Sequence, residues 1–244
     1  MPSLAAAFTT PDAKRRHVRR LFATIADRYD LVTRLLSYGQ DARWKDRLTR
    51  TIAPRPGERA LDLACGTGDI AFRLAAPGAR VCGLDITPRM LQLARRKSAS
   101  GACTWTAGDM TALPFADATF DIVTTGYGLR NVPDLDAAVA EIARVLRPGG
   151  RFASLDFNRP ESPVVRAAYL GYLDAVGGLM GWALHGEPDA YRYIPASIRR
   201  YPGAHAVADR LTRAGLGEVS VFRLLGGLMS LHVGRRAVGR SSLT

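Results

Sequence analysis

The central part of the chain alternates between short apolar runs and longer stretches whose apolar residues recur at helical spacing. The short runs predict β-strands, because buried strands read as brief, nearly continuous apolar segments. The longer stretches predict amphipathic helices. Strands and helices that alternate in this way form a parallel sheet, whose ligands bind at the carboxyl ends of the strands. The predicted strands lie near 59–64, 80–85, 103–107, 119–125 and 150–157, and the predicted helices near 68–76, 87–98 and 134–146.

Two further helices are expected before this region. Apolar positions spaced three and four apart predict an amphipathic helix over 14–29, after a loose tail at 1–12. The next helix carries Trp44 and Leu48, and it ends before Pro54 because proline does not continue a helix.

The last third of the chain begins with an apolar, helical stretch at 163–186. A membrane segment is one interpretation, but Asp174 near its centre and several glycines argue against it. A buried helix or the apolar wall of a substrate pocket fits better. A helix at 203–215 follows, and then an antiparallel pair of strands at 217–224 and 228–235.

Together these elements predict a single α/β domain with a doubly wound, mostly parallel seven-stranded sheet and an antiparallel terminal strand pair. A chain of 244 residues that is 47% apolar is long enough for one large core. Within a domain at 13–244 we expect an N-terminal helical cap at 13–56, a cofactor-binding core at 57–160, a helical insert on the substrate side at 161–200, and the last helix and strands at 201–244.

The three cysteines, Cys65, Cys82 and Cys103, fall at predicted strand positions and fit no zinc-binding spacing. We interpret them as small core residues and expect no metal site. Met1 to Thr10 lacks the basic start and apolar core of a signal peptide. A cytoplasmic location is therefore expected, with possible peripheral binding at the inner face of the plasma membrane.

The net charge of +12 comes from the two ends of the chain. Residues 1–55 carry twelve Lys and Arg against five acids, and residues 199–244 carry eight against two. Basic ends favour a polyanion or an anionic membrane surface, although a solvated arginine-rich surface explains them equally well. The core is not basic and shows no basic patch interleaved with aromatic residues, so no nucleic acid is expected as a partner.

The candidate chemistry begins at a glycine turn. Gly66-x-Gly68-x-x-Ala71 follows a predicted strand and opens a helix, which is typical of a nucleotide-cofactor loop. Alone, this match is weak. Asp62 and Asp69 flank the turn, and they would repel a pyrophosphate but suit a cationic amino-acid and sulfonium ligand. The sequence therefore favours S-adenosylmethionine over NAD.

Two more acids support this interpretation. Asp85 ends the second strand, where a carboxylate can accept both ribose hydroxyls. Asp109 follows the third strand, where it can accept a hydrogen bond from the adenine amino group. Each acid alone could be a helix N-cap, but acids at three successive strand ends make that explanation weak.

The chain resembles the demethylmenaquinone/ubiquinone C-methyltransferase family of class I S-adenosylmethionine-dependent methyltransferases, from about Phe22 to Arg235. Leu61 to Asp69 carries the resemblance to the superfamily. The narrower match rests on 22–30, 36–39, 112–115, 120–121, 127–132, 144–150, 191–194, 197–199 and 226–228. The sequence departs from the family pattern at Asp156 to Pro160 and Ser230 to Gly234, and it matches only loosely over 169–186.

The resemblance implies methyl transfer from S-adenosylmethionine to a ring carbon of a polyprenylated quinol, with S-adenosylhomocysteine as product. It implies that Thr67 and the two glycines hold the methionine part, that Asp85 holds the ribose, and that Gly108 and Asp109 flank the adenine. The implied cofactor-binding set is Asp62, Ala64, Gly66, Thr67, Gly68, Asp85, Ile86, Met90, Gly108, Asp109, Met110 and Gly126.

The implied catalytic set is Arg130, Asn131, Tyr193, His232 and Asp156. Arg130 could stabilise the quinolate, whereas His232, Tyr193 and Asp156 are the candidate bases, because arginine stays protonated. Each has a structural alternative: a salt bridge for Arg130, a packing ring for Tyr193 and a satisfied buried histidine for His232.

The acceptor is left open between a naphthoquinol and a benzoquinol. Another small aromatic or lipid acceptor needs the same core and would differ in residues 163–200. The expected partners are the polyprenyl quinol and, reversibly, an anionic membrane surface. The sequence does not fix the oligomeric state, for which a homodimer is one possibility.

Overall fold

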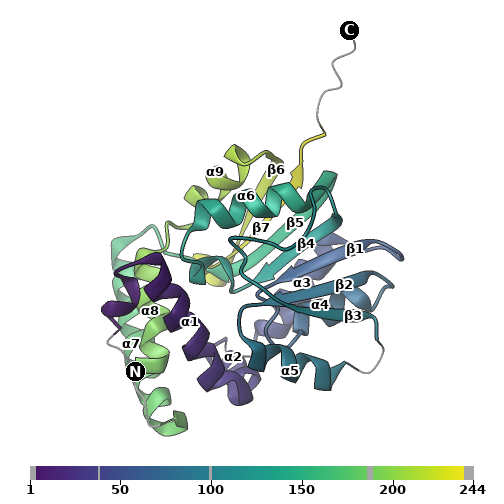
Figure 1. Cartoon of the computed structure of the whole chain (residues 1–244). Coiled ribbons are helices and arrows are strands. Elements are labelled where there is room, and N and C mark those ends of the chain that lie inside the picture. The colour runs from purple at the N-terminus through teal and green to yellow at the C-terminus, as the bar shows by residue number, and fades with distance from the viewer. Residues whose placement is uncertain (1–3, 38, 99–100, 186–188, 239–244) are drawn as a thin grey trace.

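A computed structural model describes residues 4–37, 39–98, 101–185 and 189–238. Its centre is a seven-stranded sheet of order β3-β2-β1-β4-β5-β7-β6, in which β7 runs antiparallel to both β5 and β6 (Figure 1). The predicted fold class is confirmed. The strands are β1 Arg59–Leu63, β2 Arg80–Asp85, β3 Cys103–Ala107, β4 Phe120–Gly126, β5 Leu146–Phe157, β6 Leu216–Leu224 and β7 Met229–Arg236.

Helices cover both faces of the sheet. Apolar residues of α3 and α4 pack on one face, those of α6 and α9 on the other, and α5 packs on β2 and β3. The α-helices are α1 Pro11–Ile25, α2 Tyr29–Leu36, α3 Asp41–Ile52, α4 Asp69–Ala75, α5 Pro88–Lys97, α6 Leu135–Val145, α7 Pro163–His185, α8 Asp189–Arg200 and α9 Ala204–Arg213.

The N-terminal part differs from the expectation in two ways. The supposed tail is structured from η1 (Ala6–Phe8) onward, because Phe8 stacks on Tyr193 with ring centroids 5.7 Å apart. The single helix expected at 14–29 is instead α1, a short 3₁₀ turn η2 (Ala26–Arg28) and the start of α2. Asp27, in the turn between the two helices, pairs with Arg89 of α5 at 2.5 Å.

The strand β5 also begins earlier than expected, at Leu146. The Pro148–Gly149–Gly150 segment therefore lies inside the strand, where the pairing with β4 shifts register. Gly149 has a φ of 77°, a backbone conformation that favours glycine.

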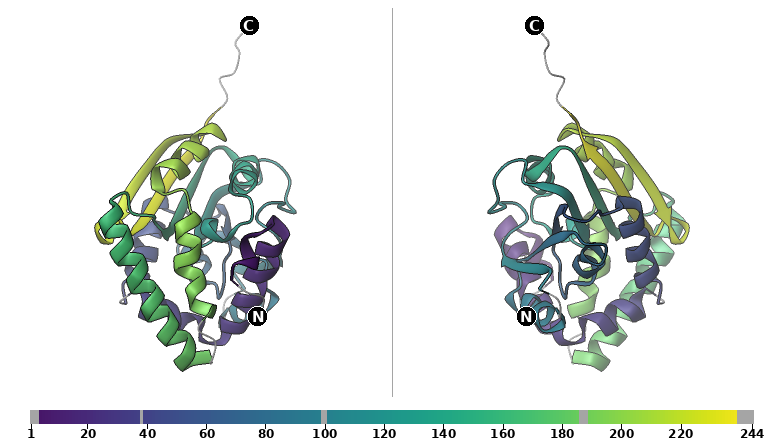
Figure 2. Two further views of the ribbon diagram at one scale, coloured as in Figure 1. Left: turned by 90° about the vertical axis from the view of Figure 1, so that its left-hand side faces the viewer. Right: turned by 90° about the vertical axis from the view of Figure 1, so that its right-hand side faces the viewer.

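One group of helices lies beyond the sheet. Figures 1 and 2 show α1, α2, α7 and α8 gathered at one end of it. A cluster of Val18, Leu21 and Ile25 from α1 with Tyr191 and Tyr193 from α8 joins the first and the later helices. Within the described residues, no helix meets the length and apolarity needed to cross a membrane.

Candidate active site

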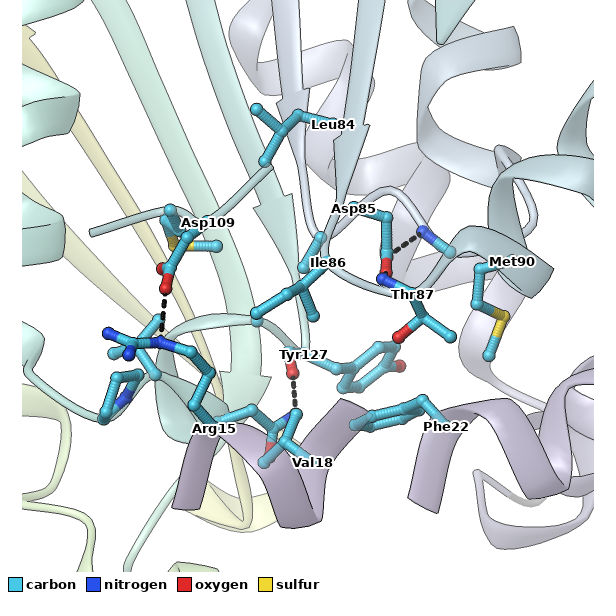
Figure 3. Close-up of a pocket in the computed structure, with 18 of the residues that line it drawn as sticks. Arg15, Val18, Phe22, Leu84, Asp85, Ile86, Thr87, Met90, Asp109 and Tyr127 are labelled. Atoms are coloured by element: carbon cyan, nitrogen blue, oxygen red, sulfur yellow. Dashed lines mark hydrogen bonds and ion pairs between the residues drawn. The ribbon is translucent and has the colours of Figure 1, made fainter. Parts of the chain in front are cut away.

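The carboxyl ends of β1, β2 and β4 border a pocket of about 670 Å³, called here the central pocket. Helix α1 covers it, and Figure 3 shows Arg15, Val18 and Phe22 facing into it from that helix. Of the residues predicted to hold the cofactor, those that line the central pocket are Ala64, Gly66, Asp85, Ile86, Met90, Asp109, Met110 and Gly126.

Two other predicted glycines serve packing. A Cβ on Gly68 would stand 2.7 Å from the Trp105 ring, and one on Gly108 would stand 2.7 Å from Leu84. Gly68 also has a φ of 92° as the residue before α4. Neither lines any pocket described here, so they shape the site indirectly.

Asp85 ties the glycine turn to the end of β2. Its Oδ2 accepts the backbone N–H of Gly66 at 2.9 Å, and its Oδ1 accepts that of Thr87 at 2.7 Å (Figure 3). Burial raises the pKa of this carboxyl, and these two hydrogen bonds oppose the rise. Asp85 therefore builds the wall of the central pocket as well as facing into it.

Asp109 is held from two sides. Arg15 of α1 donates to its Oδ2 at 2.7 Å, and the Thr111 backbone N–H donates to its Oδ1 at 2.8 Å. The ion pair connects α1 directly to the predicted adenine end of the pocket (Figure 3). The sequence reasoning counted Arg15 only among the basic residues of 1–55 and gave it no part in this site.

Behind the glycine turn lies a smaller space of about 310 Å³, called here the inner pocket. Asp62, Thr67 and Asp69 face it, together with Lys45 of α3, which the sequence reasoning missed. Lys45 pairs with Asp69 at 2.9 Å and with Asp41 at 2.6 Å. Burial alone would lower the pKa of Lys45, but these two carboxylates outweigh it and raise the pKa.

Asp62 is the buried acid of the inner pocket. Thr124 donates to its Oδ1 at 2.8 Å. Burial raises its pKa to about 7, against the hydrogen bond from Thr124 and the charge of Lys45, which lower it. An ammonium and several carboxyl groups thus face one small space, which suits the zwitterionic end of an amino acid.

A third space of about 590 Å³, called here the side pocket, is lined by Arg130, Tyr193 and Phe157 among other residues. The Arg130 guanidinium stands 5.2 Å from the Phe157 ring centroid and 3.3 Å from Asp156, and it also contacts Ser197 of α8. Both the salt bridge and the exposure to a pocket are therefore present at Arg130. Lys14 of α1 donates to the Arg130 carbonyl at 3.1 Å.

Two predicted residues carry buried polar atoms without a hydrogen-bond partner among the described residues. These atoms are the Tyr193 hydroxyl, at the side pocket, and Asn131 Oδ1, at the central pocket. Burial raises the pKa of Tyr193 to about 12, opposed by the charge of Arg130. An unpaired buried polar atom is costly, so both positions favour a polar ligand.

The remaining two candidates lie outside these pockets. Asp156 accepts from the Arg130 backbone N–H at 3.1 Å and from that of Phe157 at 2.8 Å, so it anchors Arg130. His232 lies with Nε2 2.8 Å from the Ala204 carbonyl and with Nδ1 3.4 Å from the Ser154 hydroxyl. The structure does not bring His232 to the pockets, because its antiparallel strand turns the ring under α9.

Three aromatic residues join the central and side pockets: Phe22, Tyr29 and Tyr127 line both. Tyr127 has a φ of 60°, uncommon for a bulky residue, and its hydroxyl donates to Asp41 at 2.6 Å. Strained backbone of this kind clusters at functional sites. The sequence reasoning assigned no role to these rings, although 22–30 and 127–132 were among the motifs of the resemblance.

The residues present fit S-adenosylmethionine. Asp85 and Asp109 offer acceptors at successive strand ends, and the inner pocket offers opposite charges. Asn131 adds an unpaired acceptor. A methyl donor in the central pocket and an acceptor in the side pocket would meet at the shared aromatic rings.

Known proteins resemble this chain in sequence and in fold. The family model described as the ubiE/COQ5 methyltransferase family matches residues 10–236. A ubiquinone/menaquinone biosynthesis C-methyltransferase UbiE from Cereibacter sphaeroides is 38% identical over 233 residues, covering 93% of each chain. A demethylmenaquinone methyltransferase from Streptomyces avermitilis is 39% identical over 230 residues, covering 93% of this chain and 97% of that one.

Solved structures share the fold. An S-adenosylmethionine-dependent methyltransferase from Thermotoga maritima, titled a possible histamine N-methyltransferase, has a TM-score of 0.65 at 18% identity and covers 90% of this chain and all of that one. Phosphoethanolamine N-methyltransferase 2 of Haemonchus contortus, in complex with S-adenosyl-L-methionine, has a TM-score of 0.61 at 15% identity, with 80% of this chain and 52% of that chain covered.

The solved structures support the class of fold, while the family model and the more similar relatives identify the group. Because the family model matches nearly the whole chain and the relatives match over more than nine-tenths of it, the chain belongs to the ubiE/COQ5 methyltransferase family.

Proposed function

We propose that this S-adenosylmethionine-dependent C-methyltransferase methylates a ring carbon of a polyprenylated quinol. The observation that carries the proposal is the pair of pockets that share Phe22, Tyr29 and Tyr127. One pocket has the acids of a cofactor site, and the other is apolar with a guanidinium at its wall. The names of the relatives, which refer to ubiquinone and menaquinone synthesis, supply the class of acceptor.

S-adenosylmethionine, when bound, supplies the electrophilic methyl group. In the proposal, Asp85 accepts from the ribose hydroxyls, and Asp109 with Met110 borders the adenine. Lys45 faces the carboxyl group of the methionine part and Asp62 faces its amino group, because these two residues line the inner pocket. Helix α1 excludes water from the central pocket through Phe22 and Val18.

The quinol ring occupies the side pocket in this proposal. Release of a hydroxyl proton to solvent water makes the neighbouring ring carbon nucleophilic, and the Arg130 guanidinium stabilises the resulting oxygen anion. The ring carbon takes the methyl group as the bond between that methyl group and sulfur breaks, and the carbon then loses its own proton to water, which restores the aromatic ring. Arg130 cannot itself take the proton, since it stays protonated. The Tyr193 hydroxyl, unpaired among the described residues, hydrogen-bonds a ring oxygen and fixes the orientation of the ring.

A direct assay tests the function. The purified protein is incubated with S-adenosylmethionine and with a desmethyl naphthoquinol or benzoquinol that carries a prenyl tail, and the quinones are analysed by mass spectrometry. A product heavier by one methyl group on the ring identifies the acceptor, and omission of S-adenosylmethionine is the control. Absence of methylation of both quinols, with retained cofactor binding, would overturn the proposal.

The alternative is another small aromatic or lipid acceptor. It rests on the loose match of residues 169–186 to the family pattern. The same assay with a polyketide phenol or a sterol separates the two, because only one acceptor class should be methylated at a useful rate.

We further propose that the protein docks reversibly on an anionic membrane surface to reach its apolar substrate. Arg16, Arg19 and Arg20 are exposed on α1 and support this idea. Other basic residues near the two ends of the chain contact the protein instead, and Arg240 lies outside the described residues. Those contacts join Lys14 to Arg130 and Val132, Arg15 to Asp109, Arg199 to Asp174, Arg200 to the Phe8 ring, Arg235 to Glu218, and Arg236 to Arg144 and Leu146.

A further inference from the structure

A second apolar space opens beside the side pocket. It has a volume of about 930 Å³ and lies between the end of α2, the first turns of α7 and the turn that joins β6 to β7. Figure 2 shows the start of α7 beside that turn. This space is called here the outer groove, and its walls include Leu36, Trp44, Phe157, Val165, Tyr169 and Leu225.

The outer groove continues the side pocket. Leu36 and Phe157 line both spaces. Phe157 also lies against the Arg130 guanidinium and against the Tyr127 ring, with ring centroids 5.6 Å apart. A molecule whose ring contacts Arg130 therefore meets the start of the groove at Phe157.

The groove is unusually apolar for a space open to solvent. None of its lining residues carries a charge. Val164 is 79% exposed, and Val165, Tyr172 and Leu225 are between 41% and 47% exposed, yet all four line it. Large exposed apolar side chains gathered at one place mark a binding surface.

The groove is also elongated. Val165, Ala168 and Tyr172 recur at helical spacing on one side of α7 and line it. Seven residues of helix rise about 10 Å, since each adds 1.5 Å. The space therefore follows the helix from Phe157 outward, which suits a chain-like occupant.

We propose that the outer groove binds the isoprenoid tail of the acceptor while its ring occupies the side pocket. This inference rests on the proposed function and adds a second subsite to it. The tail fits because it is apolar, linear and attached to a ring that ends at the shared residues Leu36 and Phe157.

A pair of neighbouring alanines tests the proposal. Ala168 lines the groove, whereas Ala167 is exposed on the same helix and is not among the lining residues. Ala168→Trp should fill the groove, and Ala167→Trp adds the same side chain outside it. Each variant is assayed with one ring in two forms, with a long isoprenoid tail and with none, both presented in the same detergent.

We expect Ala168→Trp to raise KM for the tailed acceptor about tenfold or more, since a pocket that loses several methylene contacts discriminates by that order. Its kcat/KM for the tailless acceptor should stay within about twofold of the wild type, and Ala167→Trp should change neither value. Leu225→Glu, which puts a charge on the opposite wall, should act like Ala168→Trp. Thermal unfolding of all three variants checks that they fold.

Several results would overturn the inference. One is equal KM values for tailed and tailless acceptors in the wild type. Another is an equal effect of the two tryptophan variants on the tailed acceptor. A third is a change of sedimentation mass on Ala168→Trp, which would make the groove an interface between copies of the chain. Failure of the wild type to methylate any quinol would instead overturn the proposed function. Tail binding would then still be tested by calorimetry of geranylgeraniol, an isoprenoid alcohol, with the wild type and with Ala168→Trp, where only the wild type should bind it.

Discussion

At the scale of single residues, the carboxylates of the site hold the protein together before any ligand arrives. Asp85 fixes the glycine turn, Asp109 fixes α1, and Asp156 fixes Arg130. Asp85 and Asp109 also line the central pocket, so each has a structural role beside the ligand-binding role proposed for it. Variants at these positions need a stability measurement beside every binding or rate measurement.

Asp85→Asn should weaken S-adenosylmethionine binding by about 1–3 kcal/mol, the range for hydrogen bonds to charged groups. The amide also presents a donor where two backbone N–H groups already point, so the turn is disturbed. Isothermal calorimetry measures the change. Asp121→Asn is the control, because Asp121 lies near the start of β4 and away from the central pocket, which the other end of that strand borders. Unchanged affinity in Asp85→Asn would reject the ribose assignment.

Arg130→Gln should lower kcat by about 10²–10³, because an oxygen anion loses its charge partner. The free energy of unfolding should also fall by about 3–5 kcal/mol, because Asp156 is left buried without a counter-charge. Cofactor affinity should remain nearly intact. Steady-state kinetics and denaturant titration measure the two effects.

The double variant Arg130→Gln with Asp156→Asn separates these roles. It removes both charges, so stability should recover while kcat stays low. Recovery of kcat together with stability would limit Arg130 to the structural salt bridge.

Asp62 should make stability depend on pH. Its folded pKa of about 7 lies above the unfolded value of about 3.9, so its stabilising effect is complete below pH 4 and is lost as the pH rises to 7. The loss is up to about 4 kcal/mol, at about 1.4 kcal/mol per pKa unit. Urea unfolding of the wild type and Asp62→Asn at pH 5 and pH 8 measures it. The free energy of unfolding of Asp62→Asn, relative to that of the wild type, should be higher at pH 8 than at pH 5. An equal difference at the two pH values would contradict the raised pKa of Asp62.

At the scale of elements, α1 forms the cover of the central pocket. Its apolar side packs through Val18 and Leu21, and Arg15 connects it to Asp109. Motion of this helix or rotation of its side chains would therefore widen the pocket. Exchange of the cofactor and opening of α1 should be coupled.

Arg15→Ala should speed cofactor release by up to about fivefold, since partly exposed ion pairs contribute about 0.2–1 kcal/mol. Arg16→Ala, exposed on the same helix, is the matched control and should leave the rate unchanged. Stopped-flow measurement gives the rate of cofactor dissociation from both variants and from the wild type. Equal rates in Arg15→Ala and the wild type would show that α1 does not limit release.

The sequence predicted local elements well and missed contacts between distant ones. Periodicity marked all seven strands within a few residues, because strand burial leaves a local signal. It could not show that α1 ends at Ile25, since the apolar spacing runs on to Tyr29. It also could not pair Arg15 with Asp109 or Lys45 with Asp69, because those contacts depend on how helices cross the sheet.

In the candidate site, too, local features could be predicted from the sequence and contacts between distant elements could not. Acids at strand ends were predictable because parallel strands bring their carboxyl ends to one edge. His232 was placed with the candidate bases by its residue type, and only the register of β7 shows it beneath Ala204.

At the scale of the whole molecule, the exposed charge and the exposed apolar surface differ in position. The arginines Arg16, Arg19 and Arg20 lie on α1, whereas Val164 and Leu225 border the outer groove. On a membrane, the protein would have to place both features near the lipid: the arginines for electrostatic attraction and the outer groove for the substrate tail.

The triple change of Arg16, Arg19 and Arg20 to Gln should weaken binding to anionic vesicles by up to about 3 kcal/mol, at about 1 kcal/mol per basic residue. Co-sedimentation across a salt series measures it, and wild-type binding should fade as salt rises. Changing the exposed Arg50, Arg80 and Arg213 to Gln is the charge-matched control. Equal binding to neutral vesicles, or none to either kind, would contradict docking by charge.

The cluster that joins α1 to α8 has a consequence for how the protein is made. Val18 and Leu21 leave the ribosome first, whereas their partners Tyr191 and Tyr193 emerge only after the whole parallel sheet has been synthesised. Contacts of such long sequence separation form late, because closing a long loop comes before any gain. The first helix to be translated therefore completes its packing only after α8 has emerged. A nascent chain arrested before Tyr191, which holds β1 to β5 but lacks β6 and β7, should leave Val18 and Leu21 of that helix accessible to proteases.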